Sequence, residues 1–267
     1  MSDFLYKIIF CYIIIINASF SESGQVVIAV GEAELSKERI AVLDFIVKST
    51  VANFHTLLAT EFIAVIKSDL SFYKKNFEVF SGTYNQEVEK NIDYFVISEL
   101  NIFQNITNVK VQVIKQKNNK KEEIYTENVT LLRNSTRENA HQIADKIYYR
   151  IVGKKSVFNT QIAFISDKDS TKAKRVKELY MMDYDGHNIR RLTNRGGIAI
   201  SPAISLDKNK VLYSVIENKK GNSKNINMYV LDLKSGKEKL ASSRRGINSG
   251  GVFTNDGENI ILSLSFS

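Results

Sequence analysis

The C-terminal part of the chain repeats itself every 49 residues, and this repeat restricts the possible fold more than any other feature. Seven segments fall into one register. They are TQIAFIS (160–166), NKVLYSV (209–215) and ENIILSL (258–264), LYMMDYD (179–185) and MYVLDLK (228–234), and SPAISLD (201–207) and GGVFTND (250–256). A repeat of about 40 to 50 residues that holds about four short strands is typical of a β-propeller blade.

The repeat predicts an incomplete, all-β propeller over residues 158–267, with about two blades and the first strand of a third. One blade cannot bury both of its faces, so it must stack against neighbouring blades. We therefore expect either that the chain is truncated or that the remaining blades come from elsewhere. An unpaired strand at the end of such an array also predicts self-association or aggregation.

Residues 22–157 predict a mixed α/β domain, because apolar runs of strand length alternate with two segments of helical periodicity. The first helix is expected over residues 49–68, with Ser49 as its cap. Its apolar face should contain Val51, Phe54, Leu57, Leu58, Phe62 and Ile63. Between the two helices, NVKVQVIKQ (108–116) alternates as a half-solvated antiparallel strand should.

The second helix is expected over residues 135–155. Ser135 and Glu138 have the spacing of a capping box at its start. Gly153 stands where a helix commonly stops. The sequence thus predicts both ends of this helix.

Residues 1–21 predict a secretory signal peptide, because a lysine precedes an unbroken apolar run and small polar residues follow it. The alternative is an anchor that is not cleaved. The single cysteine, Cys11, lies inside the apolar run, and Phe10 before it argues against lipidation. A mature chain without cysteine can form neither a disulfide nor a thiolate metal site.

The formal net charge of +8 raises the question of nucleic-acid or membrane binding. The lysines are scattered, however, and the densest cluster, KQKNNKKEE (115–123), mixes both signs between two strand-like runs. We expect this cluster to be a solvated hairpin tip rather than a binding patch, with no nucleic-acid partner.

Three motifs carry a resemblance to a known family. They are FNTQIA (158–163), DYDG (183–186) and SPAISLDKNKVLYS (201–214). With the order of signal, α/β region and repeats, they make the chain similar to the TolB family, periplasmic components of the Tol-Pal envelope system of Gram-negative bacteria. The resemblance implies an α/β N-terminal domain followed by a six-bladed propeller, in a protein that is not an enzyme and has no cofactor.

The resemblance also implies two protein partners and a role in outer-membrane integrity and cell division. A Pal-like lipoprotein is expected at the propeller mouth. A TolA-like inner-membrane protein is expected at the mature N-terminus, about residues 22–33. The binding residues there would be Glu22, Ser23, Gly24, Gln25, Val26, Val27 and Ile28. Such an apolar segment can add to a sheet edge of a partner, or it can be the first strand of its own domain.

Two loops, at residues 195–200 and 244–249, lead into the SPAIS strand and its counterpart. By the layout of the family, both loops lie near the mouth of the propeller channel. We expect Arg245, Asn248 and Ser249 to face the Pal-like partner. The alternative is an ordinary solvated loop.

The turns after these strands show where the two copies differ. Asp207 and Asp256 occupy matching positions, and we expect both to accept backbone N–H bonds in Asx turns. Lys208 stands where the family has a turn glycine, whereas the next copy keeps Gly257. Gly250–Gly251 replaces the Ser-Pro pair of the first copy.

Metal and catalytic sites are not predicted. Asp183 and Asp185 resemble the start of a calcium loop, but Gly186 comes too early and Asn194 occupies the place of the final glutamate. The segment is better explained as a β-turn between two strands. The three histidines, His55, His141 and His187, lie in no catalytic motif.

Two other functions remain open from the residues. The chain could be the N-terminal part of a propeller-containing serine peptidase, or a single α/β binding module with a degenerate propeller. A G-x-S-x-G motif after residue 267 would favour the peptidase.

Overall fold

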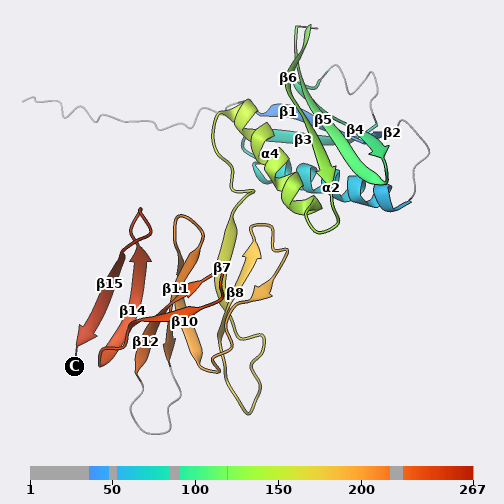
Figure 1. Ribbon diagram of the computed structural model, residues 1–267. Helices are drawn as coiled ribbons and strands as arrows, with labels where there is room; N and C mark the ends of the chain where they lie inside the picture. The colour runs from blue at the N-terminus through green and yellow to red at the C-terminus, as the bar shows by residue number, and fades with distance from the viewer. Residues whose placement is uncertain (1–35, 48–52, 84–90, 119, 217–224, 267) are drawn as a thin grey trace, which may run out of the picture. The chain divides into compact units, whose positions relative to one another are not determined.

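The computed structural model describes residues 36–47, 53–83, 91–118, 120–216 and 225–266 (Figure 1). The predicted signal peptide, the segment 22–28, Ser49 and Val51 lie outside these ranges.

The first part of the described chain forms a six-stranded sheet with the strand order β3-β1-β4-β5-β6, in which β2 also pairs with β4. The strands are β1 (Glu38–Leu43), β2 (Ile46–Val47), β3 (Phe77–Gly82), β4 (Tyr94–Phe103), β5 (Ile106–Lys117) and β6 (Lys120–Leu131). Strand β1 is parallel to β3 and β4, whereas β4, β5 and β6 are antiparallel. The predicted hairpin tip at 115–123 is confirmed, because Lys117 pairs with Lys120 where β5 turns into β6.

Two helices, α2 (Asn53–Phe72) and α4 (Thr136–Val152), pack against one face of this sheet. Alternating residues of each strand supply the sheet side of the core, such as Ile40 and Val42 on β1. The intervening Ala41 and Leu43 join a smaller cluster on the other face. The predicted alternation of β5 is confirmed, because Val109, Val111 and Val113 are fully buried. This core fixes the positions of both helices.

The predicted apolar face of the first helix is partly wrong. Phe54 and Leu57 are 49% and 67% exposed, whereas Leu58 and Phe62 are buried. The buried stripe instead continues toward the C-terminus of α2. Its members are His55, Leu58, Ala59, Phe62, Val65, Ile66, Asp69 and Leu70. The sequence pattern missed this stripe because it includes two polar residues that are satisfied by tertiary contacts.

The ends of α4 give one correction and one confirmation. Ser135 occupies the N-cap position, but its side chain makes no capping hydrogen bond, so the predicted capping box is not formed. Thr136 Oγ1 instead donates to the carbonyl of Leu132 at 2.8 Å. Gly153 ends the helix as predicted, in the left-handed conformation with φ of 74°. Its N–H group donates to the carbonyl of Tyr149 at 2.9 Å.

The repeat region forms three sheets, which confirms the all-β prediction for it (Figure 1). The first contains β7 (Gln161–Ser166), β8 (Glu178–Asp183) and β9 (Arg190–Arg191). The second contains β10 (Ile198–Ile204), β11 (Lys210–Ile216), β12 (Ile226–Asp232) and β13 (Glu238–Ser242). The third contains β14 (Gly246–Phe253) and β15 (Ile260–Phe266). The first sheet starts at β7, as the sequence repeat suggested, whereas the second and third sheets start one strand earlier, at the SPAIS strand and its counterpart.

The repeat is also visible in the backbone. The β10–β11 ladder shifts register between Ile200 and Ala203, and the β14–β15 ladder shifts at the matching place. Ser201 and Gly250, which occupy equivalent positions, both have positive φ, of 52° and 74°. A Cβ on Gly251 would lie 2.5 Å from Leu212 Cδ2, so glycine lets β14 approach the second sheet. This explains the Gly-Gly pair of the second copy.

Both predicted Asx turns are confirmed. Asp207 Oδ1 accepts the N–H of Asn209 at 3.2 Å, and Asp256 Oδ1 accepts the N–H of Glu258 at 2.9 Å. Hydrogen bonds from Ser205 and Asn209 lower the pKa of Asp207 to about 2. The residue after each aspartate has positive φ, 61° at Lys208 and 72° at Gly257.

We predict that Gly257→Ala lowers the free energy of unfolding by about 1–2 kcal/mol, because a residue with a Cβ is strained at this φ. The nearest atom to the added Cβ would be Asp207 Oδ1 at 3.9 Å, so steric overlap does not contribute. At the matching position, Lys208→Gly should be more stable than Lys208→Ala by about 1 kcal/mol. Urea denaturation followed by circular dichroism measures both effects. Equal stability of the two Lys208 variants would contradict the prediction.

Candidate partner-binding surfaces

The N-terminal segment predicted to bind a TolA-like partner, Glu22 to Ile28, lies outside the described residues. Its role therefore stays a prediction. The other predicted surface, on the loop before β14, belongs to the described part of the chain.

The predicted loop at 244–249 is mostly strand, because Asn248 and Ser249 lie within β14 and only Arg245 precedes it. The three residues predicted to face a partner also differ in their surroundings. Arg245 is exposed. Ser249 is half-buried, with its hydroxyl 3.2 Å from that of Ser201. Asn248, in contrast, is 1% exposed, so the expectation that it faces a partner is corrected.

Asn248 organises the loop from inside. Its amide nitrogen donates to the carbonyls of Ile226 at 2.7 Å and Arg244 at 2.6 Å. Its amide oxygen accepts from Ser242 Oγ at 2.6 Å. Its backbone carbonyl accepts from Ser214 Oγ at 2.9 Å. The side chain thus ties the chain on either side of Arg245 to β12 and β13, and the backbone carbonyl of Asn248 adds a bond to β11.

Glu178 at the start of β8 is a buried carboxylate that fixes the other predicted loop. It is 1% exposed and accepts hydrogen bonds from Thr193 Oγ1 at 2.6 Å and from the N–H groups of Arg195 at 3.2 Å and Gly196 at 2.8 Å. Burial raises the pKa of Glu178, but these bonds and the charge of Arg191 outweigh it and hold the pKa below its ordinary value.

Arg195 then links this loop to the second sheet. Its guanidinium lies over the ring of Tyr229, 3.5 Å from the centroid, which is the geometry of a cation–π contact. Its Nε donates to Tyr213 Oη at 3.0 Å and to Glu238 Oε2 at 3.0 Å. Tyr213 also donates to Glu238. Sequence reasoning missed this cluster because its members are scattered over 43 residues.

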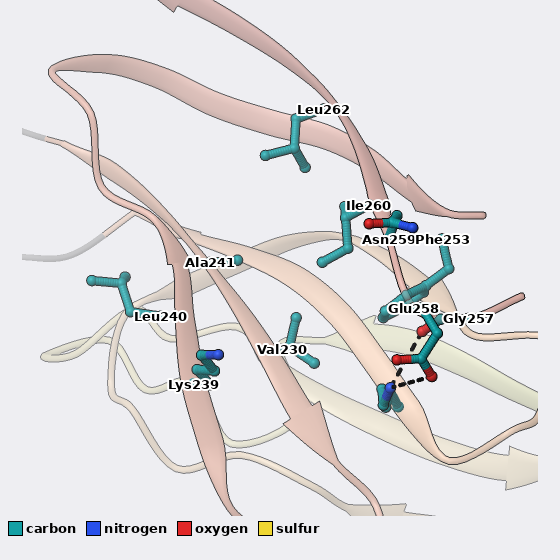
Figure 2. A pocket seen from close by; sticks show the side chains of 11 residues that line it. Val230, Lys239, Leu240, Ala241, Phe253, Gly257, Glu258, Asn259, Ile260 and Leu262 are labelled. Carbon is teal, nitrogen blue, oxygen red and sulfur yellow. Dashed lines mark hydrogen bonds and ion pairs between the residues drawn. The ribbon is translucent and has the colours of Figure 1, made fainter.

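A groove with a volume of about 480 Å³ lies between the second and third sheets. Figure 2 shows side chains from both sheets around it, including Val230, Leu240 and Ile260. Lys210 Nζ lies 3.9 Å from Glu258 Oε1 at one end of the groove. Apolar side chains and charged or amide groups therefore share the lining of this groove.

The predicted turn at DYDG is confirmed, because the N–H of Gly186 donates to the carbonyl of Asp183 at 3.0 Å. Leu179 and Met181 before the turn are buried, as expected of packing residues. Within the described residues, no group of three or more His, Cys, Asp or Glu side chains is arranged to hold a metal ion. No helix in the same ranges is long and apolar enough to cross a bilayer.

The DYDG turn takes part in a buried polar network that the sequence did not predict. His141 on α4 lies between two carboxylates, with Nδ1 2.8 Å from Asp69 Oδ2 and Nε2 3.4 Å from Asp185 Oδ2. Tyr184 donates to Asp69, and Arg137 donates to Asp185. Burial raises the pKa of Asp69, and the hydrogen bonds from His141 and Tyr184 only partly oppose this effect. The network joins α2, α4 and the turn after β8.

We predict that His141→Leu lowers the free energy of unfolding by about 3 kcal/mol, because it removes a partner from the buried Asp69 carboxylate. His187→Leu is the matched control. His187 Nδ1 also contacts Asp185, at 3.2 Å, but its side chain is 58% exposed. The control should change stability by less than about 1 kcal/mol. Urea denaturation measures both variants, and similar losses in the two would contradict the assignment.

We also predict a pH dependence from Glu178. Its pKa is lower in the folded chain than in the unfolded one, so its stabilisation is complete above about pH 5 and is lost as the pH falls through the folded value. The free energy of unfolding should therefore decline more steeply between about pH 5 and pH 3 in the unmodified chain than in Glu178→Gln. Parallel curves for the two would show that Glu178 does not contribute.

Comparison with known proteins finds relatives in sequence and in fold. Residues 148–267 match the TolB beta propeller domain. The Tol-Pal system protein TolB of Rickettsia canadensis (strain McKiel) is 34% identical over 132 residues, which are 49% of this chain and 28% of the relative. That of Rickettsia conorii (strain ATCC VR-613 / Malish 7) is 33% identical over 133 residues, 50% of this chain and 29% of the relative. The matched region thus spans less than a third of the length of these curated relatives.

Among solved structures, TolB from Acinetobacter baumannii superposes with a TM-score of 0.68, covering 87% of this chain and 56% of that one. At 19% identity, this likeness shows the fold alone. The resemblance predicted from the motifs is confirmed as a similarity: the chain resembles Tol-Pal system proteins TolB over about half of its length, and its residues 148–267 match the TolB beta propeller domain.

Proposed function

We propose that this chain is a non-enzymatic component of a Tol-Pal-type envelope system and acts by binding protein partners. The match of residues 148–267 to the TolB beta propeller domain carries the proposal. The relatives that match about half of the chain are named Tol-Pal system proteins. A periplasmic location, reached through the predicted signal at residues 1–21, is consistent with that system.

Two surfaces are proposed for the partners. The loop that Asn248 holds from inside presents Arg245 to solvent and would contact a Pal-like lipoprotein. A preorganised loop loses little conformational entropy on binding, which favours affinity. Residues 22–28 would reach a TolA-like protein by adding a strand to its sheet. Binding at both ends would link the two membranes and support outer-membrane integrity and cell division.

We predict that Arg245→Glu weakens capture of the cognate Pal-like lipoprotein at least about fivefold, because it places a repulsive charge at the proposed contact. Lys237→Glu is the matched control, since it reverses an equally exposed charge on the turn at the opposite end of β13. Pull-down with purified lipoprotein measures both. Equal effects of the two variants would remove Arg245 from the proposed surface.

We further predict that deletion of residues 22–28 abolishes capture of the TolA-like domain and leaves capture of the Pal-like lipoprotein unchanged. The deletion removes only the proposed TolA-type segment and leaves Arg245 and the residues around it unchanged in sequence. The measurement is a parallel pull-down with each partner. If the unmodified chain captures neither partner, the proposed function is wrong.

A further inference from the structure

A polar cleft with a volume of about 770 Å³ lies away from the loop and the groove described above. Its walls come from α2, the start of α4, the segment leading into β7 and the β8–β9 hairpin. Arg245, Asn248 and Ser249, the predicted partner-binding residues that the structure describes, do not line it. Volumes of roughly 300–1,000 Å³ are typical of ligand sites.

Three cations at this cleft have no carboxylate partner in the part of the chain that the structure describes. Arg190 Nη2 donates only to Met181 Sδ, at 3.3 Å, which is a weak acceptor. Lys208 Nζ donates to the carbonyl of Asn159 at 2.7 Å. Arg133 is exposed and takes part in no hydrogen bond or ion pair with a described residue.

The carboxylates that line the cleft form no ion pair with these three cations in the described part of the chain. Asp183 accepts hydrogen bonds from two side-chain amides. Glu61 Oε1 lies 3.9 Å from Arg137 Nη1, and Glu138 accepts from Gln142 Nε2 at 3.5 Å. The cationic groups of Arg133, Arg190 and Lys208 therefore have no carboxylate partner among the described residues. The carboxylates of the cleft contact other side chains instead.

Two buried nitrogen atoms of the lining have no hydrogen-bond partner among the described residues. They are Arg137 Nε and His141 Nε2, and His141 as a whole is 3% exposed. His141 Nε2 lies near Asp185 Oδ2 without forming a hydrogen bond to it. Buried polar atoms are nearly always satisfied in folded proteins. An acceptor that enters the cleft from outside would complete the site.

We propose that this cleft binds the carboxylates of an acidic segment of a protein partner. Arg133 and Arg190 would hold the carboxylates, because the planar guanidinium donates two parallel hydrogen bonds to such a group. Arg137 and His141 would supply further donors below them. A protein segment fits better than a small molecule because the walls are polar, whereas small-molecule sites are mostly apolar. The net charge of +8 would favour encounter with an acidic partner. This proposal does not depend on the proposed Tol-Pal function.

The test is the binding of fluorescein-labelled hexaglutamate to the full chain, followed by fluorescence anisotropy. R133Q/R190Q should weaken binding at least about tenfold, because two charge-assisted bidentate contacts are lost. R133K/R190K keeps both charges but loses the planar geometry, so it should weaken binding by about threefold or more. The matched control K234Q/K237Q removes two exposed charges from the β12–β13 turn, outside the cleft, and should change binding by less than about twofold.

Three results would overturn the proposal. The first is the absence of hexaglutamate binding to the unmodified chain. The second is an equal loss of binding in R133Q/R190Q and K234Q/K237Q, which would mean that net charge alone attracts the peptide. The third is binding of citrate without binding of hexaglutamate, which would assign the cleft to a small carboxylate. Circular dichroism establishes that each variant retains its fold.

Discussion

The apolar faces of the propeller sheets can leave water only by packing on one another, and the rest of the repeat region depends on this constraint. Leu179 and Met181 from the first sheet share one core with Val211, Tyr213 and Val215 from the second. On the other side, Gly251 lets the third sheet approach Leu212 closely. The second sheet is therefore held between two neighbours, and its loops are placed by that packing.

Hydrogen bonds of buried polar groups fix how the packed sheets and their loops are oriented. Apolar contacts tolerate some sliding, whereas a carboxylate such as Glu178 accepts hydrogen bonds at defined angles. Glu178 fixes the loop after β9, and Arg195 in that loop then reaches Tyr213 and Glu238 on the second sheet. Asn248 has the same role in the loop before β14. In both loops, a buried polar residue sets the backbone conformation beside an exposed arginine, Arg195 in one and Arg245 in the other.

The network around His141 likewise uses buried polar groups to fix α2 and α4 against the turn after β8. Buried charges stabilise a structure only when they are paired and hydrogen-bonded. Removing one partner therefore costs more free energy than the intact pair contributes. His141 bonds Asp69 at 2.8 Å and lies 3.4 Å from Asp185, so this network forms only in one arrangement of these elements. The open cleft beside them combines a fixed floor with exposed arginines, which is a suitable arrangement for recognising an acidic ligand.

The sequence by itself determined the propeller architecture, the Asx turns at Asp207 and Asp256, the stop of α4 at Gly153 and the resemblance to TolB. Each follows from local periodicity or from a residue type that suits one backbone conformation. Only the tertiary structure decided that Asn248 is internal, that the buried stripe of α2 includes His55 and Asp69, and that Arg133 and Arg190 share one cleft. A polar side chain is buried or exposed according to partners that lie far away in the chain, and no local pattern records those partners.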